Sequence, residues 1–390
     1  MKLLISAGEA SSDLYGAQLI EALRRRDPSL TFMGVGGAHM RAAGCEIVVE
    51  ARHLAVVGMT EILSHLPKIY AEFRKLIRAA DATKPNLGIV IDSPAFNFRV
   101  ARELHRRGVP VVYFVAPQLW AWREYRVKRV QRWIKKVLCI FPFEVEFYRK
   151  HGVDVEYVGH PLADSPVTTI SREGFAQQNG LDAAKTWIAL LPGSREKEIK
   201  QHLPVMVQGV AEIARANEDV QFLIPVASAI EPSFVLQQLE KAHKTARAAA
   251  ASGAFKLTQH ARSTLAQSRA AIVTSGTATV EAALAGVPFV VVYRLSPLTY
   301  WAARRLVKVP YAAMPNLIAG EPVVPELLQE NFTAEQVSSS VREILADGPA
   351  RAKILAGLQK VRRALQAGDA YREPAIERAA NAVLSMIKIR

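Results

Sequence analysis

Cysteines and metal-ligand patterns are scarce in this sequence. Its 390 residues include two cysteines, Cys45 and Cys139, which stand alone and predict neither a disulfide framework nor a cysteine metal site. The nine histidines show no ligand spacing such as His-Glu-x-x-His. The glycines do not form a Gly-x-Gly-x-x-Gly turn, which disfavours a nicotinamide or flavin site. We therefore expect no metal and no cofactor.

Long apolar runs are also missing. The longest uncharged apolar stretch of interest, residues 108–122, holds two prolines and is shorter than the roughly 20 residues that a membrane-spanning helix needs. The N-terminus passes from Lys2 directly into the short apolar run 3–7, which is too short for a signal peptide. These absences predict a cytoplasmic protein that is at most peripheral to a membrane.

Acidic residues are outnumbered by basic ones. The chain has 36 acidic and 50 basic residues, and its formal net charge of +14 favours anionic partners. Seven basic residues and one acid, Glu124, lie between residues 123 and 136, so this segment carries a net six of the fourteen excess charges. The seven are Arg123, Arg126, Lys128, Arg129, Arg132, Lys135 and Lys136.

The sequence is rich in short apolar runs that alternate with helical patterns, as in a parallel sheet buried on both faces. The expected strands are residues 3–7, 31–35, 87–91, 109–115, 137–140 and 153–158, then 187–191, 220–226, 255–257, 270–273 and 289–293. The expected helices include one that ends near Arg26 and is capped by Ser11, Ser12 or Asp13, residues 196–217, a basic helix at 295–308, and a helical pattern from Thr333 onward. The fold class is therefore α/β, with two parallel-sheet domains.

Two turns in the second half suit phosphate groups. Ser275-Gly276-Thr277 follows one apolar run and opens a helix, whose free N–H groups favour phosphate oxygens. Glu281 lies four residues after Thr277 on the same helix face, where a carboxylate can accept hydrogen bonds from ribose hydroxyls. The plain alternative is an ordinary strand–turn–helix unit.

The second turn is Pro192-Gly193-Ser194-Arg195. Gly193 lets the backbone approach a ligand, Ser194 offers a hydroxyl, and Arg195 offers a planar guanidinium that matches two phosphate oxygens. Further along, residues 314–320 are expected to form a loop whose Asn316 binds a sugar hydroxyl or a phosphate.

Asp92 follows the apolar run 87–91 directly. Ligands of open α/β sheets bind at the carboxyl ends of the strands, so this carboxylate is a candidate base. The alternative is an aspartate that caps the next helix from the turn.

Two segments suit contact with lipid. Apolar residues recur at helical spacing between 127 and 137, which predicts an amphipathic helix with a cationic face, and Trp120 and Trp122 before it suit a lipid–water interface. The alternative is a solvated charged face with tryptophans in the core. Residues 54–77 form an apolar helical pattern, explained by core packing or by contact with acyl chains or a bilayer.

Eight short motifs punctuate the chain: Gly8-Glu-Ala-Ser-Ser-Asp13, Ile91-Asp-Ser-Pro-Ala-Phe-Asn97, Gln118-Leu-Trp-Ala-Trp-Arg123, Phe141-Pro-Phe-Glu144, Gly159-His-Pro161, Leu190-Leu-Pro-Gly-Ser-Arg195, Ser275-Gly-Thr277 and Pro315-Asn-Leu-Ile-Ala-Gly320. In this order, and over nearly the whole chain, they resemble the landmarks of the lipid A disaccharide synthase family. Two positions depart from the family pattern: Ser12 stands where a glycine is usual, and Ala95 where a second acid is usual. The second departure puts more weight on Asp92.

The resemblance implies two facing Rossmann-like domains, the B-type glycosyltransferase (GT-B) fold. The expected domains are 1–165, which the helix 375–390 rejoins, and 166–374. The implied reaction is inverting transfer of 2,3-diacylglucosamine from UDP-2,3-diacylglucosamine to 2,3-diacylglucosamine 1-phosphate. Its products are the β-1′,6-linked disaccharide of lipid A and UDP, and no metal is needed. The expected location is the anionic inner face of the bacterial inner membrane.

The resemblance and the turn chemistry together assign roles. Asp92 is the base for the acceptor 6-hydroxyl. The residues expected on the UDP and phosphate side are Gly193, Ser194, Arg195, Gly276, Thr277, Glu281 and Asn316. Those expected on the acceptor and lipid side are Glu9, Asp13, Trp120, Trp122, Arg123, Arg126 and Arg129.

Two other functions fit parts of the pattern. A UDP-sugar epimerase, or another B-type transferase of envelope synthesis, would share the fold and the second-half turns. A basic nucleic-acid-binding protein would explain the charge but not those turns, and the sequence shows no RNA-binding motif with exposed aromatics. We therefore expect no nucleic-acid partner.

Overall fold

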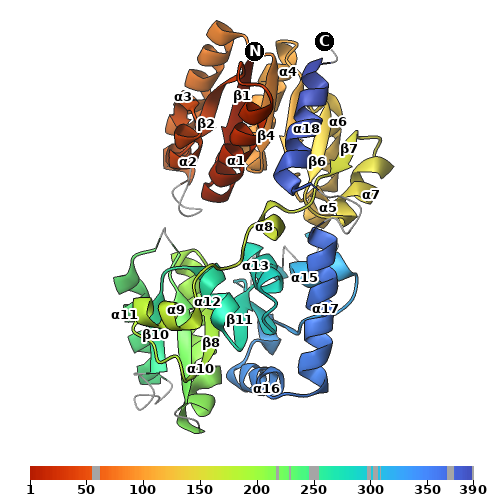
Figure 1. Ribbon diagram of the computed structural model, residues 1–390. Helices are drawn as coiled ribbons and strands as arrows, with labels where there is room; N and C mark the ends of the chain where they lie inside the picture. Colours follow the sequence, from red (N-terminus) through yellow and green to blue (C-terminus); the bar gives the residue numbers. More distant parts are fainter. Residues whose placement is uncertain are drawn as a thin grey trace. The chain divides into compact units, whose positions relative to one another are not determined.

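The computed structural model divides into two compact units, which are described separately below. Unit 1 comprises residues 1–164 and 365–390, and unit 2 comprises residues 165–364 (Figure 1). The structure describes residues 1–54, 62–216, 219–227, 230–245, 254–296, 300–301, 306–307, 309–366 and 373–388.

Unit 1 is built on a seven-stranded sheet in the order β3-β2-β1-β4-β5-β6-β7, with every pair of neighbours parallel. Its strands are β1 (Lys2–Ala7), β2 (Thr31–Gly36), β3 (Cys45–Glu50), β4 (Leu87–Ile91), β5 (Val111–Phe114), β6 (Lys136–Cys139) and β7 (Val155–Tyr157). The central strands are almost entirely buried, as their unbroken apolar runs require.

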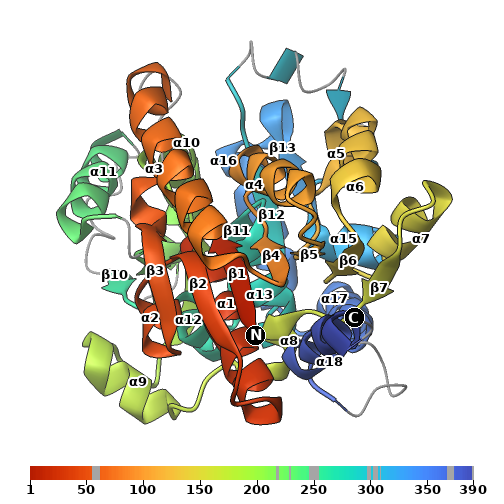
Figure 2. The ribbon, with the colours of Figure 1, turned by 90° about the horizontal axis from the view of Figure 1, so that it is seen from above.

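Helices cover both faces of this sheet: α3, α4 and α6 on one and α1, α2 and α18 on the other (Figure 2). The helices of unit 1 are α1 (Ala10–Arg26), α2 (Ala38–Ala42), η1 (Ala51–His53), α3 (Ile62–Thr83), α4 (Pro94–Arg106), α5 (Leu119–Trp122), η2 (Glu124–Arg126), α6 (Val127–Trp133), α7 (Phe143–Lys150), α8 (Pro161–Asp164) and α18 (Ala375–Lys388).

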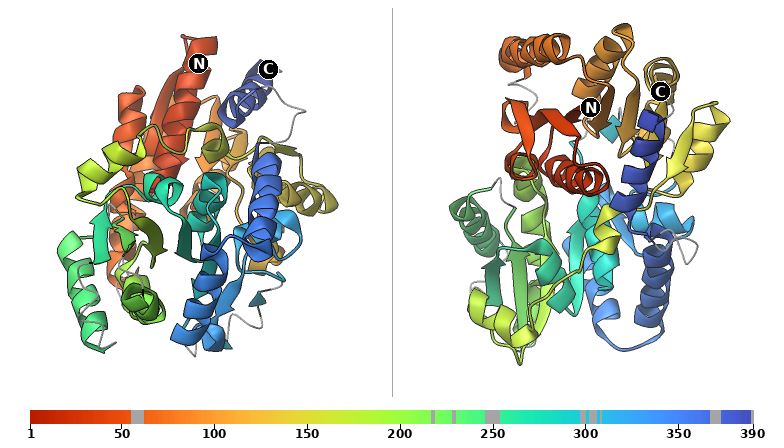
Figure 3. Two further views of the ribbon diagram at one scale, coloured as in Figure 1. Left: turned by 60° about the horizontal axis from the view of Figure 1, so that its bottom comes forward. Right: turned by 45° about the horizontal axis from the view of Figure 1, so that its top comes forward.

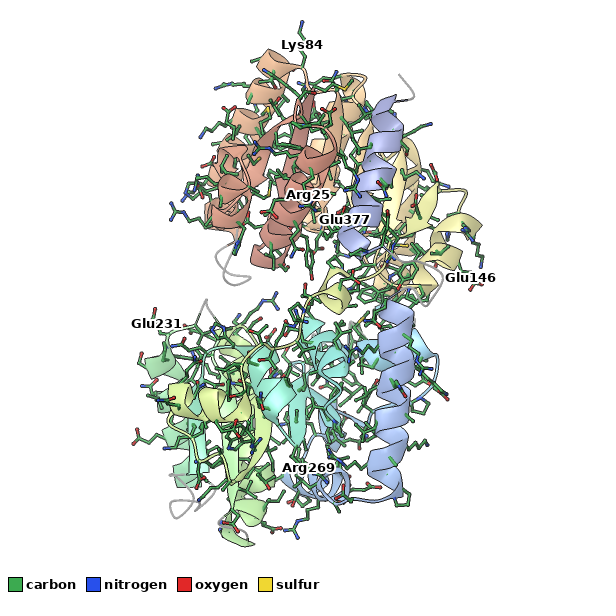
Figure 4. The ribbon with its side chains drawn as sticks, viewed as in Figure 1. Arg25, Lys84, Glu146, Glu231, Arg269 and Glu377 are labelled. Carbon is green, nitrogen blue, oxygen red and sulfur yellow. The ribbon has the colours of Figure 1, made fainter. Side chains whose placement is uncertain are left out.

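The C-terminal helix α18 returns to unit 1 and packs against α1 (Figure 1). Glu377 of α18 forms ion pairs with Arg25 and Arg26 of α1, and Figure 4 shows Arg25 and Glu377 meeting across the two helices. The buried guanidinium of Arg378 donates a 2.7 Å hydrogen bond from Nε to the carbonyl of Val158. The expected return of the last helix to the first unit is confirmed.

Unit 2 carries a six-stranded parallel sheet in the order β10-β9-β8-β11-β12-β13. The strands are β8 (Thr186–Leu191), β9 (Val220–Pro225), β10 (Phe255–Thr258), β11 (Ala270–Thr274), β12 (Phe289–Tyr293) and β13 (Glu326–Leu328). The helices are α9 (Arg172–Asn179), α10 (Glu196–Ala216), α11 (Pro232–Thr245), α12 (Ala261–Gln267), α13 (Thr277–Ala285), α15 (Met314–Ala319), η4 (Gln329–Asn331), α16 (Ala334–Leu345) and α17 (Pro349–Leu365). Helix α10 contacts α11 and α16, and α13 contacts α12 and α15. Figure 3 shows the ribbon from two further sides.

Both sheets reverse their strand order at the same relative place. In unit 1 the first strand, β1, lies between β2 and β4, and in unit 2 β8 lies between β9 and β11. Such a switch point leaves a crevice at the carboxyl ends of the two central strands, where doubly wound proteins bind ligands. Asp92, Arg195 and Thr277 all lie just beyond these strand ends.

Several expectations are corrected by the structure. The basic segment is not one helix: residues 124–126 form η2, residues 127–133 form the seven-residue α6, and Lys136 and Val137 lie in β6. Residues 314–320 form helix α15 with Gly320 at its end, not a loop. Helix α1 already begins at Ala10, so Ser11, Ser12 and Asp13 lie inside it and do not cap it. The edge strands β3 and β13 were not expected.

Other expectations lie wholly or partly outside the described residues. These are the apolar start of the helical pattern at 54–77, of which α3 is described from Ile62, and most of the basic helix expected at 295–308. Among the helices of the described ranges, none is long and apolar enough to cross a membrane.

Candidate functional site

Asp92 lies at the switch point of unit 1, in a turn with unusual backbone geometry. Asp92 and Ser93 both adopt positive φ angles, +49° and +44°, which are sparsely populated for residues other than glycine. The turn is held from inside: the carbonyl oxygen of Asp92 accepts hydrogen bonds from Tyr113 Oη and Asn97 Nδ2, each at 2.7 Å. The strained turn is therefore fixed by two buried side chains.

Asn97 links this turn to the first strand. Its side chain is fully buried, Nδ2 also donates to the carbonyl of Ile91 at 2.9 Å, and Oδ1 accepts the hydroxyl of Ser6 at 2.6 Å. Sequence reasoning assigned Asn97 no role, although it closes the motif that begins at Ile91.

The carboxyl group of Asp92 has a raised pKa. Burial, and then the neighbouring carboxylate of Glu9, raise the pKa of Asp92 to about 6, against a weaker opposing effect of the Ser93 N–H. A carboxylate with such a pKa is ionised at neutral pH and is a stronger base than an exposed aspartate. The N-cap position of α4 is Ser93, with no side-chain cap hydrogen bond.

Two acids of the first loop, Glu9 and Asp13, were both expected on the acceptor side, but they have different environments in the structure. Glu9 is exposed at the N-cap of α1 and makes no side-chain cap hydrogen bond. Asp13 is buried, and its carboxylate accepts the N–H groups of Gly37, His39 and Met40 at the start of α2. Asp13 therefore caps a helix, and its expected contact with the acceptor is not supported.

A second buried acid, Glu144, lies close enough to Asp92 for the two charges to interact. Its Oε1 accepts the indole N–H of Trp120 at 3.1 Å, and its Oε2 accepts the N–H of Phe141 at 3.2 Å. Burial raises the pKa of Glu144 to about 8, while these donors oppose the rise. Trp120 is thus anchored inside unit 1. Sequence reasoning gave Glu144 no role beyond its place in a motif.

Two exposed aromatic rings and two half-buried arginines form an aromatic and cationic patch at the start of the basic segment: Trp122, Tyr125, Arg123 and Arg126. Trp122 is 43% exposed and Tyr125 66% exposed. The guanidinium of Arg123 stacks 3.6 Å from the ring centre of Trp122, and that of Arg126 lies 5.9 Å from the ring centre of Tyr125. Arg129, also exposed, lies over Phe98 instead at 6.0 Å.

In unit 2, the turn after β8 presents Ser194 and Arg195 to solvent. Gly193 has a φ of +128°, which favours glycine. The Ser194 N–H and the Arg195 guanidinium both donate to the carboxylate of Glu198 in the first turn of α10.

The turn after β11 is open. Gly276 has a φ of +142° at the N-cap of α13, and nothing lies within 4 Å of the place where its Cβ would stand. The hydroxyl of Ser275 donates to the carbonyl of Ala312 at 2.8 Å, which fixes the turn, while Thr277 is exposed. Glu281 lies one turn along the same helix, and burial raises its pKa, opposed by the charge of Arg262.

A buried histidine ties the two turns of unit 2 to the sheet. His202 Nδ1 lies 3.0 Å from the carbonyl of Pro192 and 3.4 Å from the hydroxyl of Thr274, and Nε2 accepts the N–H of Arg294 at 3.2 Å. Burial lowers the pKa of His202, so the ring is neutral at pH 7. Sequence reasoning missed this residue, because its partners lie far away along the chain.

Asn316 is a structural residue. Its side chain is buried, its Oδ1 accepts the N–H groups of Val323 and Val324, and its Nδ2 donates to Glu326 and to the carbonyl of Val324. The amide has no unused group for a ligand, so the expected contact with UDP is not supported. Within the described residues, no cluster of three or more His, Cys, Asp or Glu side chains has a geometry that would hold a metal ion.

Comparison with known proteins gives a consistent result. The family model for lipid-A-disaccharide synthetase matches residues 3–380. The lipid-A-disaccharide synthase of Koribacter versatilis is 51% identical over 387 residues, which cover 99% of this chain and 98% of that protein.

Solved structures share the fold at low identity. The UDP-GlcNAc 2-epimerase of Neisseria meningitidis, bound to UDP-GlcNAc, has a TM-score of 0.66 at 12% identity, with full coverage of both chains. The glycosyltransferase of kitacinnamycin has a TM-score of 0.65 at 13% identity, with 98% of each chain covered. At such identities the likeness concerns the fold, which is GT-B-like in both units.

Proposed function

Because this chain belongs to the lipid-A-disaccharide synthase family and is a glycosyltransferase of lipid A biosynthesis, we propose that Asp92 is its catalytic base and that unit 2 binds UDP. The proposed donor is UDP-2,3-diacylglucosamine and the proposed acceptor is 2,3-diacylglucosamine 1-phosphate. The products are the β-1′,6-linked disaccharide 1-phosphate and UDP.

The proposed step moves one proton and exchanges one bond. The carboxylate of Asp92 takes the proton of the acceptor 6-hydroxyl as its oxygen attacks the anomeric carbon of the donor. The bond from that carbon to the UDP oxygen breaks, and UDP leaves with the electron pair. Attack opposite the leaving group inverts the configuration from α to β.

The observation that carries this proposal is the placement of Asp92. It combines a switch-point position, a turn held by Tyr113 and Asn97, and a pKa raised to about 6. Positioned general bases with a pKa near the working pH contribute typically 10²–10⁴-fold to rate.

The donor side of the proposal uses the two turns of unit 2. Arg195 and the Ser194 N–H stabilise the charge that develops on the diphosphate, and the open N-terminus of α13 with the Thr277 hydroxyl binds a phosphate. Glu281 accepts hydrogen bonds from the ribose. Loss of one donor that stabilises transition-state charge typically costs about 3 kcal/mol of barrier.

The lipid side of the proposal uses the aromatic and cationic patch. Exposed aromatic rings with stacked guanidinium groups suit the headgroup region of a bilayer, and each basic residue near an anionic surface gains about 1 kcal/mol. We propose that this patch holds the protein on the anionic inner leaflet, where both acylated sugars reside.

A direct assay tests the chemistry. The wild type, supplied with the diacylated UDP-sugar and the 1-phosphate acceptor, is expected to form a disaccharide that mass spectrometry detects. Asp92→Asn keeps the shape of the side chain without its basicity, and we expect its turnover to fall by at least 10²-fold. The control is Asp154→Asn, which removes an exposed carboxylate of unit 1 that pairs only with Lys136 among the described residues. Near-normal turnover in Asp92→Asn would refute the assignment.

A further inference from the structure

The space beside Gly193 is filled by the protein itself. A Cβ atom added to Gly193 would lie 2.5 Å from both the Cβ and the Oε2 of Glu198. The glycine, with its φ of +128°, therefore allows this turn to close onto a side chain of helix α10. The sequence had suggested that Gly193 admits a ligand at this place.

The Glu198 carboxylate uses the donors that the proposed function assigns to the diphosphate. The N–H of Ser194 donates to Oε2 at 3.0 Å, and the Nη1 of Arg195 donates to Oε1 at 2.9 Å. Two oxygens of one anion are thus bound by a backbone N–H and a guanidinium. Phosphate groups are recognised by the same two kinds of donor.

This contact is accessible to solvent. The side chain of Arg195 is 77% exposed and that of Glu198 is 18% exposed. An ion pair with one largely exposed partner is weakened by solvent screening, so the carboxylate can give way to a more highly charged anion. If it stayed in place, its charge would repel the incoming diphosphate.

We propose that Glu198 occupies the diphosphate-binding donors of the free protein and sets the affinity for UDP by competing with its phosphates. This inference rests on the proposed function, because it takes the turn after β8 as a diphosphate site. UDP is also a product of the proposed reaction. A built-in competitor therefore favours release of UDP at the expense of tight binding.

The test compares UDP binding by the full chain and by Glu198→Gln, measured by titration calorimetry. The variant keeps the shape of the side chain and removes its charge, so the Kd for UDP is expected to fall by threefold to tenfold. Uridine, which has no phosphate, is expected to bind both proteins with the same Kd. Glu198→Asp serves as a second variant if the first does not fold, because its shorter side chain cannot reach both donors and is also expected to bind UDP more tightly.

Glu196→Gln is the matched control. Glu196 lies in the same first turn of α10, pairs with Lys200, and makes no contact with Ser194 or Arg195 among the described interactions. Its loss removes the same charge from the same turn, so an unchanged Kd separates direct competition from a general electrostatic effect. UDP binding by Glu198→Gln that is equal to or weaker than that of the wild type overturns the inference. A wild type that binds no UDP overturns the proposed UDP site itself, so the two failures are distinguishable.

Discussion

The hydroxyl of Tyr113 donates a 2.7 Å hydrogen bond to the carbonyl oxygen of Asp92. Tyr113 stands in β5, fully buried, and Asp92 follows the neighbouring strand β4. The bond reaches the backbone of the proposed base and does not use its carboxylate. It therefore holds the left-handed turn from inside the sheet.

Tyr113→Phe is expected to loosen this turn without exposing the core. The loss of one buried hydrogen bond costs about 1 kcal/mol of stability, and Asn97 still bonds to the same carbonyl. We expect kcat to fall about tenfold, which corresponds to ~1.4 kcal/mol of barrier, with KM nearly unchanged. Steady-state kinetics and urea unfolding measure the two effects.

Tyr148→Phe is the control for that substitution. Tyr148 is equally buried and donates a 2.7 Å bond to the carbonyl of Pro117, away from the Asp92 turn. Equal losses of kcat in both variants would contradict a specific role for Tyr113.

The acid limb of the pH–rate profile is expected to follow Asp92. The base has to be ionised, so kcat/KM is expected to fall as the pH drops below about 6. Glu9→Gln removes the neighbouring carboxylate that raises this pKa, and the limb is expected to shift to lower pH. Glu21→Gln, an exposed position on α1, is the control and should leave the limb in place. An acid limb that Glu9→Gln does not move would count against the assignment.

Asp92 is also expected to make stability depend on pH. The pKa of Asp92 is about 6 in the folded protein, above the unfolded value of about 3.9. Below about pH 3.9 the carboxyl is neutral in both states and does not destabilise the fold. As the pH rises through about 6 the buried group becomes charged, and the folded protein loses stability. Asp92→Asn stays neutral, so it is expected to be more stable than the wild type at pH 8 and to lose this advantage towards pH 4. Thermal unfolding at several pH values measures the difference, and a constant difference across the range would be the contrary result.

The patch formed by Trp122, Arg123, Tyr125 and Arg126 is expected to mediate membrane binding. Substitution of both Trp122 and Tyr125 by alanine removes two exposed rings from the headgroup region, and we expect weaker sedimentation with phosphatidylglycerol vesicles. Leu236→Ala, an exposed apolar position in unit 2, is the control. Tyr70 is an exposed residue of α3. If Tyr70→Ala weakens vesicle binding and the change at Trp122 and Tyr125 does not, the main membrane contact is at the helical pattern 54–77 and not at the patch.

Arg378 is expected to be a main attachment of α18. It is buried and donates to the carbonyl groups of Val158 and Glu373, so Arg378→Met leaves the buried carbonyl of Val158 without its charged donor. Charge-assisted hydrogen bonds contribute ~1.5–3 kcal/mol each. We therefore expect Arg378→Met to lower the free energy of unfolding in urea by at least about 1.5 kcal/mol. Arg25→Met removes only the exposed partner of Glu377 and is expected to cost less than about 1 kcal/mol. If both variants lose the same free energy of unfolding, Arg378 is not a main attachment of α18.

The sequence predicted the strands next to the site and the edge strands β7 and β10, but it missed the edge strands β3 and β13. The run Leu87–Ile91 is apolar at every position because it is buried on both faces, so Asp92 could be placed at its end. The edge strand β3 carries Glu46 and Glu50, and β13 has only three residues, so neither shows that signal.

Helical periodicity failed where two elements followed each other closely. Val127 and Val130 lie in α6, but Val137 continues the same spacing only by coincidence, because it begins the apolar part of β6. A periodic pattern does not show where one element ends without a capping or breaking residue.

The polar core residues could not be predicted from local patterns. His202 meets partners that are up to 92 residues away, and Asn97 joins a serine 91 residues away. Asn316 resembled a ligand contact because an amide serves equally well for a backbone turn and for a sugar. Only the fold distinguishes the two uses.

The return of α18 affects how the protein is made. During translation, residues 1–164 leave the ribosome long before Ala375, and at ~5–20 residues per second the interval is roughly 10–40 s. Throughout that interval the surface of α1 that later receives α18 is bare, and Arg25 and Arg26 have no Glu377 to meet. The first unit therefore completes its packing only when the last helix has been synthesised.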